Sequence, residues 1–236
     1  MSASIPPLNK AMGDNLAWLA FAVNVSMHFT QVPLIRQMLL DPDADSRARY
    51  SLLPAVFQAA ACSQWIGYAT FVLPSLPLVI NNIIGISVAF CYIVSFVIAR
   101  PKWPSKVFAA LLFMGVTGFS VLVYGVLYFA GAYPSRDVWA LSITTAVTIV
   151  LWASPLAALY AAARELDTKR VPVPLTLVMF STTLLWLIVG FLVGDMALIV
   201  CSAFGVSLSF LQVVVMIWIR FQTPKSIDAV TIRTEK

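Results

Sequence analysis

The sequence has 236 residues, of which 61% are apolar and only 11% are charged. A soluble domain usually carries about a quarter charged residues, so this composition excludes a soluble protein and predicts that lipid surrounds most of the chain. The net charge of +5 comes from basic residues in short segments between apolar runs, which indicates membrane topology and argues against nucleic-acid binding.

Seven apolar runs are long enough to cross a bilayer, which takes about 20 helical residues. In chain order they are 15–36, 52–73, 77–99, 107–131, 138–162, 172–193 and 196–219. The first run exceeds the apolar core of a cleaved signal peptide, so we expect it to stay as the first helix. The sequence therefore predicts an all-α integral membrane protein with seven transmembrane helices.

The distribution of Lys and Arg predicts the orientation of these helices. Thirteen of the fifteen lie after the first, third and fifth spans or in the tail, and only Lys10 and Arg136 lie on the other side. The positive-inside rule then places residues 1–14 outside and the tail, 220–236, in the cytosol. The plasma membrane is the expected location, and an endomembrane stays open because no address motif is visible.

Proline, glycine and polar markers recur about 120 positions apart. The pairs are Pro33 and Pro155, Gly67 and Gly190, and Asn82 and Ser202. We interpret them as a duplication of three helices, 15–99 and 138–219, joined by a linker helix within 100–137. The linker restores the orientation of the second copy, which makes the repeats parallel (3+1+3). Transporters use this architecture and bind substrate near the midplane between the halves.

Ionisable residues are almost absent from the predicted spans, where no Asp, Glu or Lys lies deep. This excludes an opsin, which needs a buried lysine, and an intramembrane aspartyl protease, and it argues against ion coupling. His28, the sole histidine, is the exception. It could be a proton site, a hydrogen-bond donor to substrate, or a neutral imidazole bonded to a neighbouring helix.

Four neutral side chains fall in one layer roughly 8–15 Å below the predicted outer surface, at 1.5 Å per residue. They are Ser63, Asn82, Trp186 and Ser202. A buried amide needs partners, which the hydroxyls of a sugar would supply while the Trp186 ring covers the apolar face of the sugar. Helix–helix hydrogen bonds and aromatic packing remain alternatives. Trp65, two residues from Ser63, is expected to pack.

Four prolines form a second layer near the predicted inner ends of the helices: Pro33, Pro54, Pro155 and Pro172. Proline inside a helix removes a hydrogen bond and permits a kink, so this layer could be a hinge for alternating access. The alternative is proline in the first turn of a helix, where it is tolerated.

At these residues the sequence resembles the SWEET family of sugar transporters. The second half carries the stronger match, through Ala153-Ser154-Pro155-Leu156, Thr168 to Pro172, Trp186, Gly190, Gly194-Asp195 and Phe204-Gly205. The resemblance implies a uniporter for mono- or disaccharides, with pocket roles for Ser63, Asn82, Trp186 and Ser202, hinge roles for the prolines, and an outer-gate role for Asp195. Two positions depart from the family pattern: Ser202 replaces the usual Asn, and Leu52 stands where a hinge proline is expected.

We therefore predict a facilitative, bidirectional sugar carrier whose partners are its sugar and the lipid bilayer. Homo-oligomers are compatible with this architecture. No nucleophile–base pair or metal cluster appears in the sequence, so neither an enzyme nor a cofactor is expected. Two alternatives stay open: a proton-coupled PQ-loop-type transporter of amino acids or other small solutes, and a seven-helix receptor or membrane scaffold.

Overall fold

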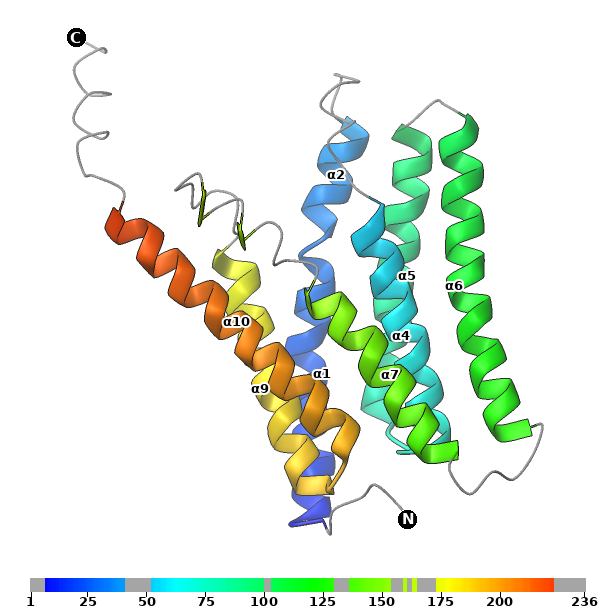
Figure 1. Cartoon of the computed structure of the whole chain (residues 1–236), viewed down its shortest axis with the longest axis vertical. Coiled ribbons are helices and arrows are strands. Elements are labelled where there is room, and N and C mark those ends of the chain that lie inside the picture. The colour runs from blue at the N-terminus through cyan, green and yellow to red at the C-terminus, as the bar shows by residue number, and fades with distance from the viewer. Residues whose placement is uncertain are drawn as a thin grey trace.

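A computed structural model describes most of the chain, and its regular elements are helices (Figure 1). The described residues are 7–40, 52–99, 103–129, 136–153, 159–160, 163–164 and 173–222. Five of the described helical segments are long and apolar enough to cross a membrane by length and composition.

The first span consists of two helices, α1 (Lys10–Phe29) and α2 (Val32–Leu40), separated by a two-residue break. Pro33 causes the break, because it has no N–H to donate to the carbonyl four residues earlier. The amides of Thr30 and Gln31 instead bond to carbonyls three residues earlier, at 3.2 and 3.3 Å. The helix is therefore interrupted next to Pro33.

The first span is also longer than the predicted 15–36. It begins at Lys10 because Asn9 caps the helix, accepting a hydrogen bond from the Met12 amide at 3.0 Å. It continues to Leu40 because the break at Pro33 does not end the helical segment.

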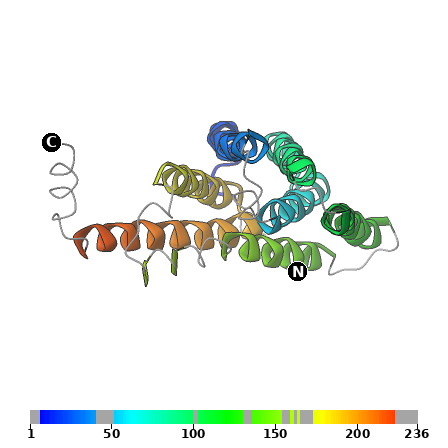
Figure 2. The same ribbon diagram turned by 90° about the horizontal axis from the view of Figure 1, so that it is seen from above.

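Six further helices lie in the described part of the chain, and with α1–α2 they make the seven spans of the predicted 3+1+3 architecture. They are α4 (Leu53–Phe71), α5 (Leu76–Ala99), α6 (Trp103–Phe129), α7 (Arg136–Ala153), α9 (Val173–Val193) and α10 (Met196–Gln222). The linker helix α6 lies at the periphery, against α4 and α7 (Figure 2). Much of the predicted stretch 154–162 lies outside the described residues.

The two repeats meet closely at the end where α1 begins. There α1 packs along α9, and a Cβ on Gly13 would lie only 2.7 Å from a methyl carbon of Val193. The α9–α10 turn lies at the same end (Figure 1). It needs only two residues because Gly194 adopts a positive φ of 75° and Asp195 caps α10.

Buried apolar side chains form one shared core at this end and separate cores at the other. The shared core draws on all seven spans, including Tyr68 of α4, Tyr124 of α6 and Leu198 of α10. Toward the opposite end, one cluster around Met38 and Tyr92 belongs to the first repeat, and another around Met216 belongs to the second. Among the described residues, the halves are therefore joined at one end only.

Candidate substrate cavity

A cavity of about 230 Å³ lies between the repeats, lined by α1, α4, α5, α7, α9 and α10. It holds the space of roughly eight water molecules, at about 30 Å³ each. No Asp, Glu, Lys or Arg is among the described residues that line it. The cavity therefore suits a small, uncharged, polar solute.

The helical phase of α1 and α4 decides which of their side chains reach the cavity. From the first span these are Asn24, Met27 and His28 of α1 and Gln31 of the break, beside Thr30, and on α4 they are Gln58, Ala61, Cys62 and Trp65. Both sets follow the i, i+3, i+4, i+7 spacing of a single helix face. Each helix thus presents one continuous stripe to the cavity.

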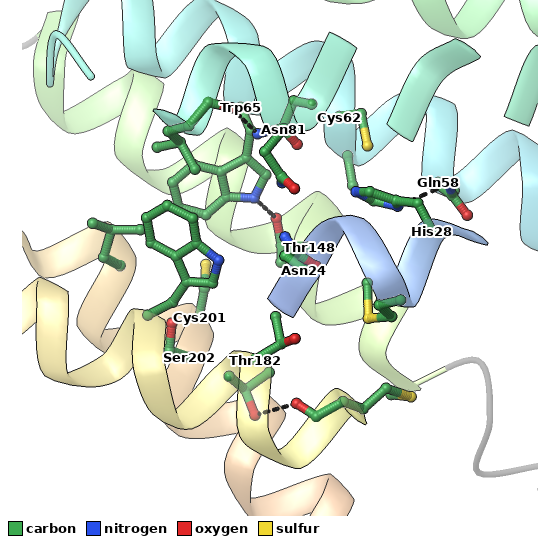
Figure 3. Close-up of a pocket in the computed structure, with 18 of the residues that line it drawn as sticks. Asn24, His28, Gln58, Cys62, Trp65, Asn81, Thr148, Thr182, Cys201 and Ser202 are labelled. Carbon is green, nitrogen blue, oxygen red and sulfur yellow. Dashed lines mark hydrogen bonds between the residues drawn. The ribbon is translucent and has the colours of Figure 1, made fainter. Parts of the chain in front are cut away.

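Two tryptophans give the cavity aromatic surface, Trp65 from α4 and Trp186 from α9. The Trp65 indole nitrogen donates to Thr148 Oγ1 of α7 at 2.9 Å, which holds its ring in place (Figure 3). Thr148 in turn donates to the Thr144 carbonyl at 2.7 Å. These rings offer apolar faces to the C–H side of a ligand, while the indole N–H of Trp65 is already bonded to protein.

Four polar atoms in the cavity lining make no hydrogen bond to the described protein atoms. They are Asn24 Oδ1, His28 Nε2, Asn81 Oδ1 and Thr182 Oγ1. Each belongs to a side chain that is at most 9% exposed. Each of the four atoms itself exposes less than 1 Å² of surface, so a solute in the cavity reaches them only if neighbouring side chains move. The His28 ring and the Asn81 side chain also interact with one another.

Asp195 lies in the α9–α10 turn, at the end of the bundle where the repeats meet. Its Oδ2 accepts a hydrogen bond from the Tyr68 hydroxyl at 2.8 Å, and its Oδ1 accepts one from the Leu198 amide at 2.9 Å. Tyr68 belongs to the first repeat and Asp195 to the turn of the second, so the bond crosses between them. Burial raises the pKa of the Asp195 carboxyl above its ordinary value. The Tyr68 ring also packs edge-on against Trp65, with centroids 5.6 Å apart.

Comparison with known proteins identifies the family. Residues 14–103 and 140–224 match the family model described as "Sugar efflux transporter for intercellular exchange". The chain belongs to this family, the SWEET family. A solved eukaryotic SWEET transporter shows the same fold, with a TM-score of 0.78 and 20% identity over 89% of this chain and 99% of that chain. The predicted family and fold class are confirmed.

A curated relative is the Bidirectional sugar transporter SWEET11 of Oryza sativa subsp. japonica. It is 23% identical over 176 residues, which are 74% of this chain and 57% of that protein. The chain thus spans little more than half the length of this relative. Membership of a transporter family agrees with the expectation that the chain is not an enzyme.

Three of the four residues that the SWEET resemblance placed in the pocket line the cavity: Asn82, Trp186 and Ser202. Ser63 does not. It is half-buried, and its hydroxyl donates to the Ala59 carbonyl at 2.7 Å in its own helix. Ser63 lies outside the α4 stripe, whereas Trp65, expected only to pack, lies within it.

The proline layer is described only in part. Pro33 lies at the break between α1 and α2, with its side chain exposed. Pro54 lies in the first turn of α4, the position of the alternative interpretation. Pro155 and Pro172 lie outside the described residues. A hinge role therefore remains a prediction.

Sequence reasoning missed several lining residues, among them Asn24, Gln58, Asn81 and Thr182. Helical phase was the available signal for Asn24, which stands four residues before His28, a candidate site residue of the sequence. Gln58 stands seven residues before Trp65, which the sequence predicted only to pack. For Asn81 helical phase gave no signal, because Asn82, the adjacent residue on α5, was the one predicted to lie in the polar layer and adjacent helix positions face different directions.

Proposed function

We propose that this SWEET-family protein is a facilitative, bidirectional uniporter for a neutral sugar. The observation that carries the proposal is the cavity between the repeats, with amide and hydroxyl groups, two tryptophan rings and no formally charged side chain among its described lining residues. Hydroxyl groups of a sugar pair with the amides, and its C–H face packs on the indole rings. The description of the family and the rice relative support a sugar as the substrate.

The size of the cavity favours a monosaccharide over a disaccharide. Its volume of about 230 Å³ falls below the roughly 300–1,000 Å³ usual for drug-sized ligands. A cavity of this volume suits a single pyranose ring. A second sugar ring would need the cavity to widen.

Alternating access is supported by the unequal ends of the bundle. One end is closed by the Tyr68–Asp195 hydrogen bond and the shared core, while at the other end the repeats have separate cores. With the orientation predicted from Lys and Arg, the closed end faces outward, so we infer an inward-facing state. The break at Pro33 supplies a hinge in the first repeat. A plasma-membrane location with a cytosolic C-terminus completes the proposal.

Uptake of radiolabelled glucose and sucrose into liposomes holding the purified protein tests this function, with and without a pH gradient. We expect glucose flux that exceeds sucrose flux and ignores the gradient. Asn82→Ala should lose most of this flux, and Ser63→Ala, on the same depth layer but outside the cavity, should keep it. Absence of flux for either sugar would overturn the proposal.

One observation favours a second candidate, a proton-coupled transporter: His28 lines the cavity. Proton coupling predicts that flux follows the imposed pH gradient and that His28→Gln becomes indifferent to it. Flux equal with and without the gradient excludes this candidate.

A further inference from the structure

The indole nitrogen of Trp65 has a hydrogen-bond partner on the other side of the boundary between the repeats. Trp65 lies on α4 of the first repeat, and its Nε1 donates to Thr148 Oγ1 of α7, in the second repeat, at 2.9 Å. Both side chains line the cavity, with 8% of Trp65 and 4% of Thr148 exposed. Figure 3 shows the Thr148 hydroxyl at the nitrogen edge of the ring. An indole N–H can only donate, so this bond uses the one polar group of the ring.

The Thr148 hydroxyl is itself fixed by its own helix. Its proton goes to the Thr144 carbonyl, which lies 2.7 Å away. A hydroxyl has one proton and two lone pairs, so this donation leaves the oxygen as the acceptor that faces Trp65. The Cys201 thiol of α10 lies beside the same hydroxyl. Because the Thr148 oxygen is held in this way, it defines one place for the indole nitrogen.

The Trp65 ring is restrained on a second side by Tyr68, one turn further along α4. The two rings pack edge to face, with an interplanar angle of 78°, and the Tyr68 hydroxyl is bonded to Asp195. A planar ring that is held at its nitrogen and against a second ring keeps one orientation. In that orientation the N–H is turned toward α7, and the ring contributes apolar surface to the cavity wall.

We propose that Thr148 is a positioning residue for substrate recognition, which holds the Trp65 indole so that the ring offers the sugar apolar surface and no hydrogen-bond donor. The proposal rests on a sugar as the ligand of this cavity, as proposed above. It places a binding surface of the first repeat under the control of the second. The sugar then meets Trp65 through C–H groups, and its hydroxyl groups pair with other side chains.

Two conservative variants of Thr148 test the role of its hydroxyl. Thr148→Val keeps the shape of the side chain and removes the acceptor, whereas Thr148→Ser keeps the acceptor. Without it the ring leaves its orientation in a fraction of the molecules, which raises the apparent Kd. Because one neutral hydrogen bond is lost, we expect Thr148→Val to raise the Kd for glucose about 2- to 12-fold, and Thr148→Ser to stay within about 2-fold of wild type. Calorimetric titration in detergent measures both. An unchanged Kd in Thr148→Val, or no rescue by Thr148→Ser, would overturn the proposal.

A double-mutant cycle with Trp65→Phe separates positioning from direct contact between Thr148 and the sugar. Phenylalanine keeps an aromatic ring but has no N–H, so in this background there is no bond to Thr148 left to remove. Thr148→Val should then change the Kd by less than about 2-fold. The same loss in both backgrounds means that Thr148 acts without Trp65, which refutes the positioning role.

The hydrogen bond is observed directly, with no sugar present, by NMR of protein with isotope-labelled indole nitrogens. The chain has seven tryptophans, and the signal that is missing from Trp65→Phe belongs to Trp65. Thr148→Val should move this indole proton upfield and Thr148→Ser should not. The control is Thr144→Val, one turn earlier on α7, whose hydroxyl is bonded to Tyr124 and lies outside the cavity lining. It should leave the Trp65 signal and the Kd unchanged.

The outcomes for wild type separate this proposal from the transport function. A Trp65 signal that does not move in Thr148→Val overturns the positioning role, whatever the protein transports. Sugar binding without liposome flux would remove the transport function and leave the role of Thr148 intact. Absence of any sugar binding to wild type would remove both.

Discussion

We expect the hydrogen bond between Tyr68 and Asp195 to help close the predicted outer end. Tyr68→Phe removes the donor to Asp195 Oδ2, a 2.8 Å hydrogen bond between the repeats, and leaves the ring in place. Asp195 is only 9% exposed, so its oxygen gains little water in return. A buried acceptor left without its donor costs about 1–3 kcal/mol. When the gate is open, water satisfies that oxygen, so the closed state alone is destabilised.

This cost converts into a shift of about 5- to 150-fold toward the open gate, at about 1.4 kcal/mol per factor of ten. Cysteine labelling can measure it, because Cys62 and Cys201 line the cavity. In a Cys91→Ser background they are the remaining thiols of the three in the chain. A membrane-impermeant thiol reagent applied from the Asp195 side should label Tyr68→Phe faster by that factor.

Tyr124→Phe is the matched control. Its hydroxyl is also buried and shares a 2.7 Å hydrogen bond with Thr144 Oγ1, but that bond joins α6 to α7 and does not cross the closed end. Labelling of Tyr124→Phe should stay near the wild-type rate. Equal rates in wild type and Tyr68→Phe, or an equal acceleration in both variants, would refute the assignment of Tyr68 and Asp195 to the gate.

Three further predictions concern single side chains. Trp186→Ala should abolish detectable sugar uptake while Trp186→Phe retains part of it, because an aromatic face remains; equal loss in both would contradict a stacking role. Gly190→Ala should lower the melting temperature in detergent, because the added Cβ would lie 2.9 Å from the backbone nitrogen of Ile199, at a cost of about 1–3 kcal/mol. In the control Gly118→Ala the added Cβ meets open space, so the melting temperature should not change. Because the pKa of Asp195 is raised in the native state, the native state binds more protons than the unfolded chain once the pH exceeds about 3.9. The contribution of Asp195 to stability should therefore fall as the pH rises through that raised pKa. Asp195→Asn should flatten this pH dependence in thermal melts.

The fold was predictable because the bilayer imposes a simple rule on sequence. Each apolar run must be a helix of about 20 residues, which gave the spans, and the recurrence of Pro33 and Gly67 in the second half gave the repeats. The boundaries depend on local caps instead. The start of α1 is fixed by the Asn9 side chain, which no hydropathy average detects.

The cavity was predictable only in part because depth and direction are separate coordinates. Counting residues from a helix end places Ser63 and Asn82 at similar depths, but only helical phase determines which side chain faces inward. Ser63 was placed by depth and resemblance, and its hydroxyl bonds to its own helix. Asn81 lines the cavity through packing of α5 that its sequence does not encode locally.

The cavity wall and the break in the first span share one side chain, Gln58. Gln58 faces His28 Nδ1 and accepts from Gln31, which lies within the break between α1 and α2. A change of backbone conformation at the break therefore moves Gln31, which is a hydrogen-bond partner of Gln58. A ligand shifts a conformational equilibrium only by its differential affinity for the two states. Gln31 and Gln58 both line the cavity, so a sugar bound there would contact groups whose positions depend on the break.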